Sequence, residues 1–177
     1  GGDGNDVVLT RLGYDITWTN NASGDWNVAA NWSPNRVPGV HDTVLINKTV
    51  TVTLNAPVTC ASLNMGNSGS PTLTGTGDLS VFVLNLTSGT LSGSQVVTVL
   101  QQMDWRGGTM TGSGRTTIQP GAVLNLANGG VFNLSGGRTL ENGGTVLWMA
   151  GNYLMNCAVI TNRAGALFET RTATNRL

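Results

Sequence analysis

Charge is the first thing that this sequence lacks. Charged residues make up 10% of the 177 residues, nine basic and nine acidic, and Lys48 is the only lysine. An average globular domain carries about 25% charged residues. Without a basic patch there is no electrostatic footprint for a phosphate backbone, which argues against nucleic-acid binding. The scarcity of lysine and glutamate, both strong helix formers, argues against a helical bundle or a coiled coil.

Cysteine, histidine and long apolar runs are also scarce. Two cysteines, Cys60 and Cys157, are too few for a disulfide scaffold. His41 is the only histidine, so neither a zinc site nor a Ser-His-Asp triad can be assembled around it. It precedes Asp42 in a predicted surface turn, where we expect Asp42 to hydrogen-bond the backbone. No apolar run approaches the ~18 residues of a transmembrane helix.

The abundant residues are Gly, Thr, Asn and Ser, and they recur with a period of about 20 residues. The segment LNLTSGTLSGS from Leu84 aligns without gaps with MDWRGGTMTGS from Met103. Three apolar columns share the period. The first column is Ile46, Met65, Leu86, Trp105, Leu126, Trp148 and Phe168. The second is Val58, Leu79, Val99, Ile118, Leu140 and Ile160, and the third is Leu54, Leu73, Leu91, Met110, Val131 and Leu154.

Three apolar anchors in each repeat predict a β-solenoid coil with three short strands. The predicted fold is all-β, a parallel β-helix of six to seven coils over residues 46–177, and the usual sense of parallel crossovers makes it right-handed. A β-sandwich is the structural alternative, but it gives no reason for alignment at a fixed period. Stacking would place Cys60 and Cys157 four to five coils apart, about 20 Å. We therefore expect no disulfide and two buried free thiols.

The first 15 residues do not fit the repeat. They are predicted to be a linker or the tail of a preceding module, and no secretory leader is evident in GGDGND. GGDGNDVVL matches a calcium-binding nonapeptide, which makes Asp3 and Asp6 weak calcium candidates. Calcium in such arrays lies between successive turns, so one copy does not make a site. No other metal or cofactor is expected.

Residues 16–45 are predicted to form an N-terminal cap, because the exposed end of a solenoid needs one. This segment contains Trp18, Trp26 and Trp32. A carbohydrate-binding platform is the alternative, since indole rings can stack on sugar faces. Burial of all three rings over the first coil would favour capping, and exposure on one lateral face would favour binding.

Polar residues are expected to form rows along the outside of the coils. Asn64, Asn85, Asp104 and Asn125 share one row, in which stacked amides can hydrogen-bond along the axis or contact a glycan. Asp104 has no carboxylate beside it in this row, so no catalytic pair is expected. Two further rows flank the third column over three coils. They are Thr72, Thr90 and Thr109, and Thr74, Ser92 and Thr111. These are similar to the rows of ice-binding solenoids, or are ordinary outward strand threonines.

Several segments resemble a known family. SGDWNVAANWSPNRVPGVHDTVLI (23–46) resembles the start of β-solenoid modules in large bacterial surface proteins. DWRGGTMTGSGRTTIQPGAVLNL (104–126) and GRTLENGGTVLW (137–148) are similar to their repeats. The family is the autotransporter-type, adhesin-like right-handed parallel β-helix repeat proteins. The resemblance implies secretion or display on a bacterial cell surface, within a large modular parent protein.

The function expected from the repeats and the resemblance is that of an exported structural or adhesive module, a rigid spacer or scaffold. Its partners would be glycans, other surface proteins or further copies of itself. A carbohydrate-binding β-helix is the first alternative, and a carbohydrate-cleaving one is less favoured because no carboxylate pair emerges. The last alternative is a self-assembling filament or surface-layer unit, because an unpaired solenoid end invites pairing.

Overall fold

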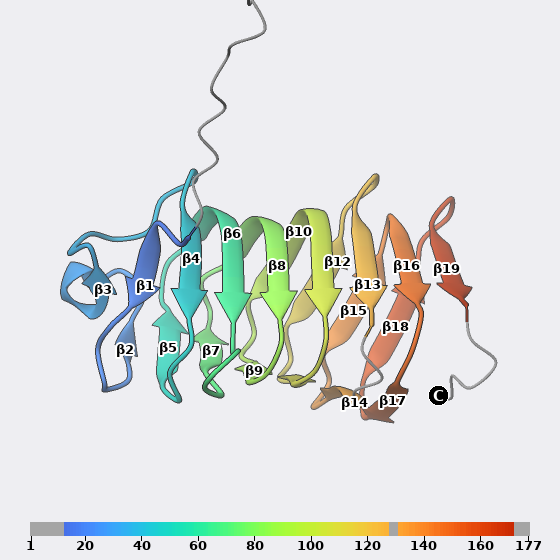
Figure 1. Cartoon of the computed structure of the whole chain (residues 1–177). Coiled ribbons are helices and arrows are strands. Elements are labelled where there is room, and N and C mark those ends of the chain that lie inside the picture. Colours follow the sequence, from blue (N-terminus) through green and yellow to red (C-terminus); the bar gives the residue numbers. More distant parts are fainter. Residues whose placement is uncertain (1–12, 128–130, 172–177) are drawn as a thin grey trace, which may run out of the picture.

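The chain folds into a β-solenoid of about six turns, each of about 21 residues (Figure 1). The computed structural model describes residues 13–127 and 131–171. Within these ranges the strands of successive coils pair in parallel, and the helical content is one short turn, η1 (Ala29–Asn31). The predicted β-solenoid is therefore confirmed.

Each coil contributes three strand segments, which stack into three faces. We call the seven-stranded sheet the hydroxyl face. It consists of β2 (Gly24–Asp25), β5 (Thr51–Leu54), β7 (Thr72–Gly75), β9 (Thr90–Leu91), β11 (Thr109–Met110), β14 (Val131–Ser135) and β17 (Asn152–Asn156). The other two faces belong to one twelve-stranded sheet, because long strands bend from one face onto the next.

The bent strands are β6 (Val58–Met65), β8 (Leu79–Leu86) and β10 (Val96–Trp105). Their second halves lie on what we call the ladder face. This face also has β1 (Ile16–Trp18), β4 (Thr43–Ile46), β13 (Val123–Leu126), β16 (Thr145–Trp148) and β19 (Leu167–Thr170). Their first halves lie on the third face, with β12 (Arg115–Ile118), β15 (Thr139–Asn142) and β18 (Val159–Asn162).

Strand alternation explains why these residues build a core. In β8, Leu79, Val81, Leu84 and Leu86 are fully buried, while the residues between them face outward. The alternation changes phase at the bend in the middle of the strand, where the chain turns from the third face to the ladder face. Stacked coils bury these side chains against one another, which a single coil cannot do.

The predicted columns are right in period and partly wrong in register. The first column is confirmed from Ile46 to Trp148, but Phe168 pairs with Val146, and Thr170 follows Trp148. In the second column, Val97 and Thr116 follow Leu79. The prediction placed Val99 and Ile118 there. A slip of two residues keeps a side chain on the same face of a strand, so hydrophobicity alone does not detect it.

The third column carries a similar error. Val52, not Leu54, pairs with Leu73. Further along, Met110 pairs with Leu134, and Leu134 with Met155. Val131 and Leu154, which the prediction placed in this column, are 50% and 55% exposed. The corrected register changes which polar residues flank the column on the hydroxyl face.

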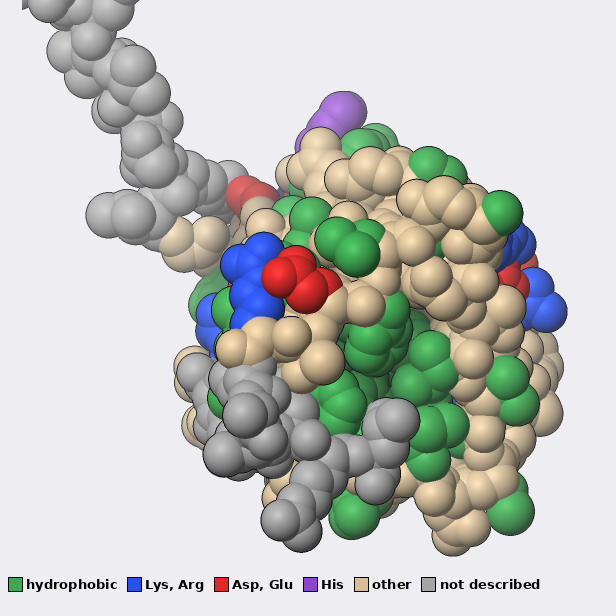
Figure 2. All heavy atoms as spheres, turned by 90° about the vertical axis from the view of Figure 1, so that its right-hand side faces the viewer, with side chains coloured by type: hydrophobic (Ala, Val, Ile, Leu, Met, Phe, Trp, Pro, Cys, Tyr) green, Lys and Arg blue, Asp and Glu red, His purple; other side chains and the backbone are tan. Residues whose placement is uncertain are grey.

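The two ends of the coil stack differ. At the N-terminal end, β3 (Trp32–Ser33) pairs antiparallel with β1 and closes that edge. At the other end, β17, β18 and β19 are the last strands of the three faces. Figure 2 looks onto this end and shows hydrophobic side chains gathered in its centre. Leu154, Val159 and Leu167 are about half exposed here, at 55%, 51% and 50%.

One corner of the coils depends on stacked glycines. Gly93 and Gly112 both have positive φ, +89° and +83°. A Cβ atom added to Gly112 would lie 2.4 Å from the carbonyl oxygen of Gly93 in the coil below. Both the backbone conformation and the close approach therefore require glycine here.

We expect Gly112→Ala to destabilise the fold more than Gly121→Ala. Gly121 also has positive φ (+84°), but an added Cβ would meet nothing within 4 Å. In Gly121→Ala, the left-handed backbone conformation alone should lower the free energy of unfolding by about 1–2 kcal/mol. The backbone clash in Gly112→Ala should add about 1–3 kcal/mol. Urea unfolding of both variants measures the difference, and equal losses would contradict the stacked-glycine explanation.

The two cysteines are free, as predicted, but only one is buried. Cys60 is fully buried on β6, whereas Cys157 is exposed in a turn with φ +52°. The prediction of two buried thiols is therefore wrong for Cys157, because the strand ends before it. Burial raises the pKa of the Cys60 thiol to about 12.

A thiol reagent should label Cys157 in the folded protein and Cys60 only after unfolding.

The raised pKa of Cys60 also predicts a pH effect. Above the ordinary value of 9.0, the unfolded chain releases this proton and the folded chain keeps it. Cys60 should therefore leave the free energy of unfolding unaffected below pH 9 and lower it as the pH rises from about 9 to 12. Denaturant titrations of Cys60→Ala should show a shallower alkaline loss than the parent, and identical pH profiles would contradict this.

Candidate functional site

The three tryptophans of the predicted cap pack together inside the first coil. Trp18 and Trp26 are fully buried, and Trp32 is 2% exposed. The Trp32 ring meets both others edge to face, with centroids 4.9 Å and 4.8 Å apart, and its Nε1 donates to the Trp26 carbonyl at 2.7 Å. Burial leaves no indole face free for a sugar, which supports the capping interpretation.

The predicted polar row is present in register on the ladder face. Asn64 pairs with Asn85, Asn85 with Asp104, and Asp104 with Asn125. The Asn85 amide donates to Asn64 Oδ1 at 2.8 Å, and the Asn125 amide donates to Asp104 Oδ1 at 2.8 Å. Asn64 in turn donates to the Val44 carbonyl at 3.3 Å. We call these four residues the amide ladder.

Asp104 interrupts the amide ladder. Its carboxylate accepts hydrogen bonds from Asn125, from Gln102 at 3.0 Å and from Arg106 at 3.1 Å. In the described part of the chain no hydrogen bond joins Asp104 to Asn85. The Asn85 amide nitrogen is directed at Asn64, and an ionised carboxylate has no proton to donate to the Asn85 side-chain oxygen. The ladder thus consists of two bonded pairs with a break between them.

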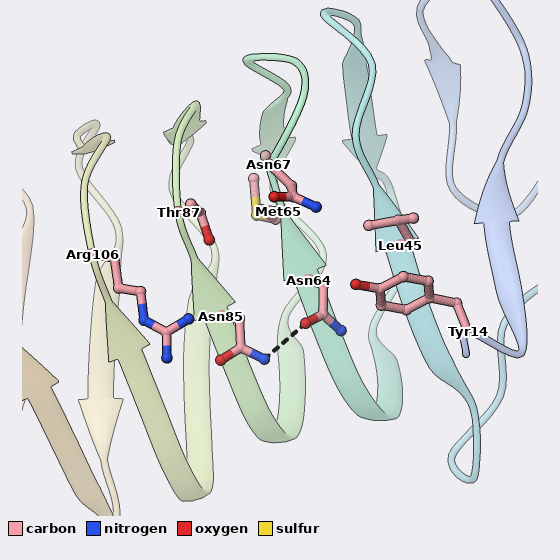
Figure 3. A pocket seen from close by; sticks show the side chains of 9 residues that line it. Tyr14, Leu45, Asn64, Met65, Asn67, Asn85, Thr87 and Arg106 are labelled. Carbon is pink, nitrogen blue, oxygen red and sulfur yellow. Dashed lines mark hydrogen bonds between the residues drawn. The ribbon is translucent and has the colours of Figure 1, made fainter. Parts of the chain in front are cut away.

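A shallow depression of about 330 Å³ lies over one of these pairs (Figure 3). Asn64 and Asn85 lie in its middle, the Tyr14 ring lies beside Leu45 at one end, and Arg106 lies at the other (Figure 3). We call this depression the groove. Its remaining lining residues are Met65, Gly66, Asn67 and Thr87.

The groove brings together some of the predicted site residues and omits others. Asn64 and Asn85 line it, whereas Asp104 and Asn125 continue the ladder beyond it. Sequence reasoning assigned no binding role to Tyr14 or Arg106. Tyr14 precedes the repeat and carries no periodic signal. Arg106 directly follows the inward Trp105, whose register was predicted correctly, so the sequence could have placed Arg106 at the ladder-face corner.

The chemistry of the groove suits a neutral, hydroxyl-rich ligand. Tyr14 is 41% exposed and offers both a ring face and a phenol. The amides of Asn64 and Asn85 have donors and acceptors, and Arg106 adds donors at the far end. The Arg106 side chain is 45% exposed and is partly neutralised by its ion pair with Asp104.

Carboxylates are spread over the faces and do not form a pair beside Asp104. Its neighbours in the adjacent coils are Asn85 and Asn125. Glu141 lies on the third face, in ion pairs with Arg115 at 2.8 Å and with Arg163. Among the described residues, no three His, Cys, Asp or Glu side chains are close enough to hold a metal ion. The calcium candidates Asp3 and Asp6 lie outside the described residues.

The turn that contains His41 is held by hydrogen bonds of the neighbouring Asp42. His41 is exposed, and Asp42 Oδ2 accepts a hydrogen bond from the Gly39 amide at 2.6 Å, as predicted. Both carboxylate oxygens also accept from the Arg36 guanidinium, at 2.6 Å each. This bidentate pair raises the pKa of Arg36. Asp42 therefore holds the turn that leads into β4.

No protein-family model, curated protein or solved structure matches this chain. In the part of the chain that the structure describes, no helix is long and apolar enough to cross a membrane.

We expect Asp104→Asn to preserve stability and Asp104→Ala to reduce it. An asparagine at position 104 can still accept from Asn125, and it adds a donor aimed at Asn85, worth about 1 kcal/mol. This offsets the loss of the exposed ion pair with Arg106, which contributes about 0–1 kcal/mol. Asp104→Ala leaves the amides of Asn125 and Gln102 without their acceptor, and it should lower the free energy of unfolding by about 1–2 kcal/mol. Equal destabilisation in the two variants, measured by urea unfolding, would show that the ladder does not stabilise the coils.

Proposed function

We propose that the chain is an adhesive, rigid spacer module of an exported protein, and that the groove binds carbohydrate. The observation that carries the carbohydrate part is the exposed Tyr14 ring beside the amides of Asn64 and Asn85 in one depression. An aromatic face covers the C–H side of a sugar ring, while amide groups bond its hydroxyls. The same residues offer little to a highly charged ligand.

The spacer part is supported by the continuity of the coils. Strands pair in parallel register on all three faces from β4 to β16. Their fully buried apolar residues form one continuous core. A stack of this kind has no internal hinge between separate domains, so it holds a binding site at a fixed distance and orientation.

The size of the groove supports weak binding at each site. About 330 Å³ is at the small end of ligand sites, and its shallow shape leaves much of a sugar in contact with water. Adhesion through such sites depends on many copies that act together. A large surface protein with several modules, as the resemblance of residues 23–46 implies, would supply them.

Self-association through the C-terminal end of the described coils is a second candidate. Leu154, Met155, Val159 and Leu167 are 41–55% exposed there, beside β17, β18 and β19, whose outer edges pair with no strand among the described residues. The closed N-terminal edge at β3 does not offer a matching parallel strand. Association would therefore join the C-terminal ends of the coil stacks of two copies.

The test is retention of the purified chain on a panel of insoluble and immobilised polysaccharides. Saturable retention is expected, and Tyr14→Ala should weaken it about tenfold, a loss of 1.4 kcal/mol. Tyr14→Phe should bind nearly as well as the parent, because it keeps the ring face. Arg106→Ala should also weaken retention, because it removes donors at the end of the groove.

Arg163→Ala is the matched control, because Arg163 is an exposed arginine on the third face. It should bind like the parent. No retention of the folded parent on any glycan would refute the carbohydrate part of the proposal. Sedimentation velocity at several concentrations would then test self-association.

A further inference from the structure

The corrected register reveals a longer array on the hydroxyl face than the sequence predicted. Thr51 pairs with Thr72, Thr72 with Thr90, and Thr90 with Thr109. Thr53 pairs with Thr74 on the other side of the buried column. The second row continues through Ser92, Thr111 and Ser135, which hold the same place relative to Leu91, Met110 and Leu134. Four successive coils thus carry two hydroxyls each, and a fifth carries Asn133 and Ser135.

These side chains point outward because the residue between each pair points inward. Val52, Leu73, Leu91, Met110 and Leu134 are all fully buried. The hydroxyl residues on either side of them are partly exposed. Thr111 and Ser135 hydrogen-bond each other at 3.1 Å. Among the described residues, the other hydroxyl groups of the two rows make no hydrogen bond with a protein group, so they are free to bond with solvent.

Strand geometry gives this array two regular repeats. Successive coils place equivalent hydroxyls about 4.7–4.9 Å apart along the axis. The two rows are two residues apart on each strand, about 6.6 Å across. Threonine is stiff at χ1, so its methyl and hydroxyl groups hold a fixed orientation when unbound. Little conformational entropy is then lost when the whole array meets a surface.

We propose that the hydroxyl face binds ice. An ice surface is a lattice that repeats in two directions, and a protein surface can match it when its own groups repeat in two directions. Water molecules on a prism face of ice have spacings close to the two repeats of the hydroxyl rows. Between β5 and β11 the outward residues of the two rows are uncharged and include no aromatic ring. An ordered water lattice, which offers only hydrogen bonds and close fit, is the partner that this chemistry favours.

This site is independent of the groove. The groove lies on the ladder face and depends on Tyr14, Asn64 and Asn85. The hydroxyl face is a separate sheet with no residue in common. The two proposals can therefore fail or succeed separately.

The test is partition of the purified full chain into a slowly growing ice hemisphere, together with inhibition of ice recrystallisation. The parent should be enriched in the ice fraction. Thr90→Tyr places a large ring in the middle of the array and should abolish the enrichment. Thr98→Tyr is the matched control, because Thr98 is a partly exposed threonine in the middle of the third face. It should partition like the parent.

Thr90→Val together with Thr109→Val keeps the shape of the face and provides a second test if tyrosine perturbs folding. Loss of hydroxyls should reduce enrichment, while circular dichroism and unfolding midpoints stay close to the parent values. The proposal is overturned if the folded parent is excluded from ice, or if Thr90→Tyr and Thr98→Tyr partition alike. Loss of polysaccharide retention in Thr90→Tyr, without ice binding by the parent, would assign the face to glycans instead.

Discussion

Parallel stacking of coils in register is the constraint on which the rest of this structure depends. Each backbone hydrogen bond between coils places a residue directly over its counterpart one turn earlier, about 4.8 Å away. What one position requires is then required along the whole column. Leu73, Leu91 and Met110 fill the same part of the core, and Gly93 and Gly112 repeat the same corner. The long-range order therefore comes from a local rule applied coil after coil.

The same constraint turns single polar residues into extended surfaces. One outward Asn or Asp on each of four successive coils becomes the amide ladder, and two outward hydroxyls on each coil become a two-dimensional array. Residues that depart from the repeat then give local features that the other coils do not have. Asp104 breaks the ladder between two bonded pairs, and Tyr14, which precedes the first strand, supplies the aromatic ring that no coil provides at the groove. Recognition in this molecule would combine a repeated surface with a few such exceptions.

The sequence predicted the fold class and the amide ladder because both depend on a period that polar and apolar residues share. Asn64, Asn85 and Asn125 stand out against an apolar background, which pins their register. Apolar columns are less certain, because Val97 and Val99 both point inward and only pairing distinguishes them. A similar slip of two residues placed Leu54 where Val52 belongs, and the predicted rows therefore left out Thr51 and Thr53. Tyr14 could not be found, since its place beside Leu45 arises from a chain path outside the repeat.

The direction of the hydrogen bonds has a mechanical consequence for a chain of this shape. Bonds between coils run along the solenoid axis, so a pulling force along that axis loads them a few at a time, beginning at the last described coil with β19. The coils would peel off singly instead of shearing together. Each peeled coil of about 21 residues releases roughly 70 Å of chain. A tether built this way resists bending and yields in small steps under tension, which dissipates sudden loads while most coils stay folded.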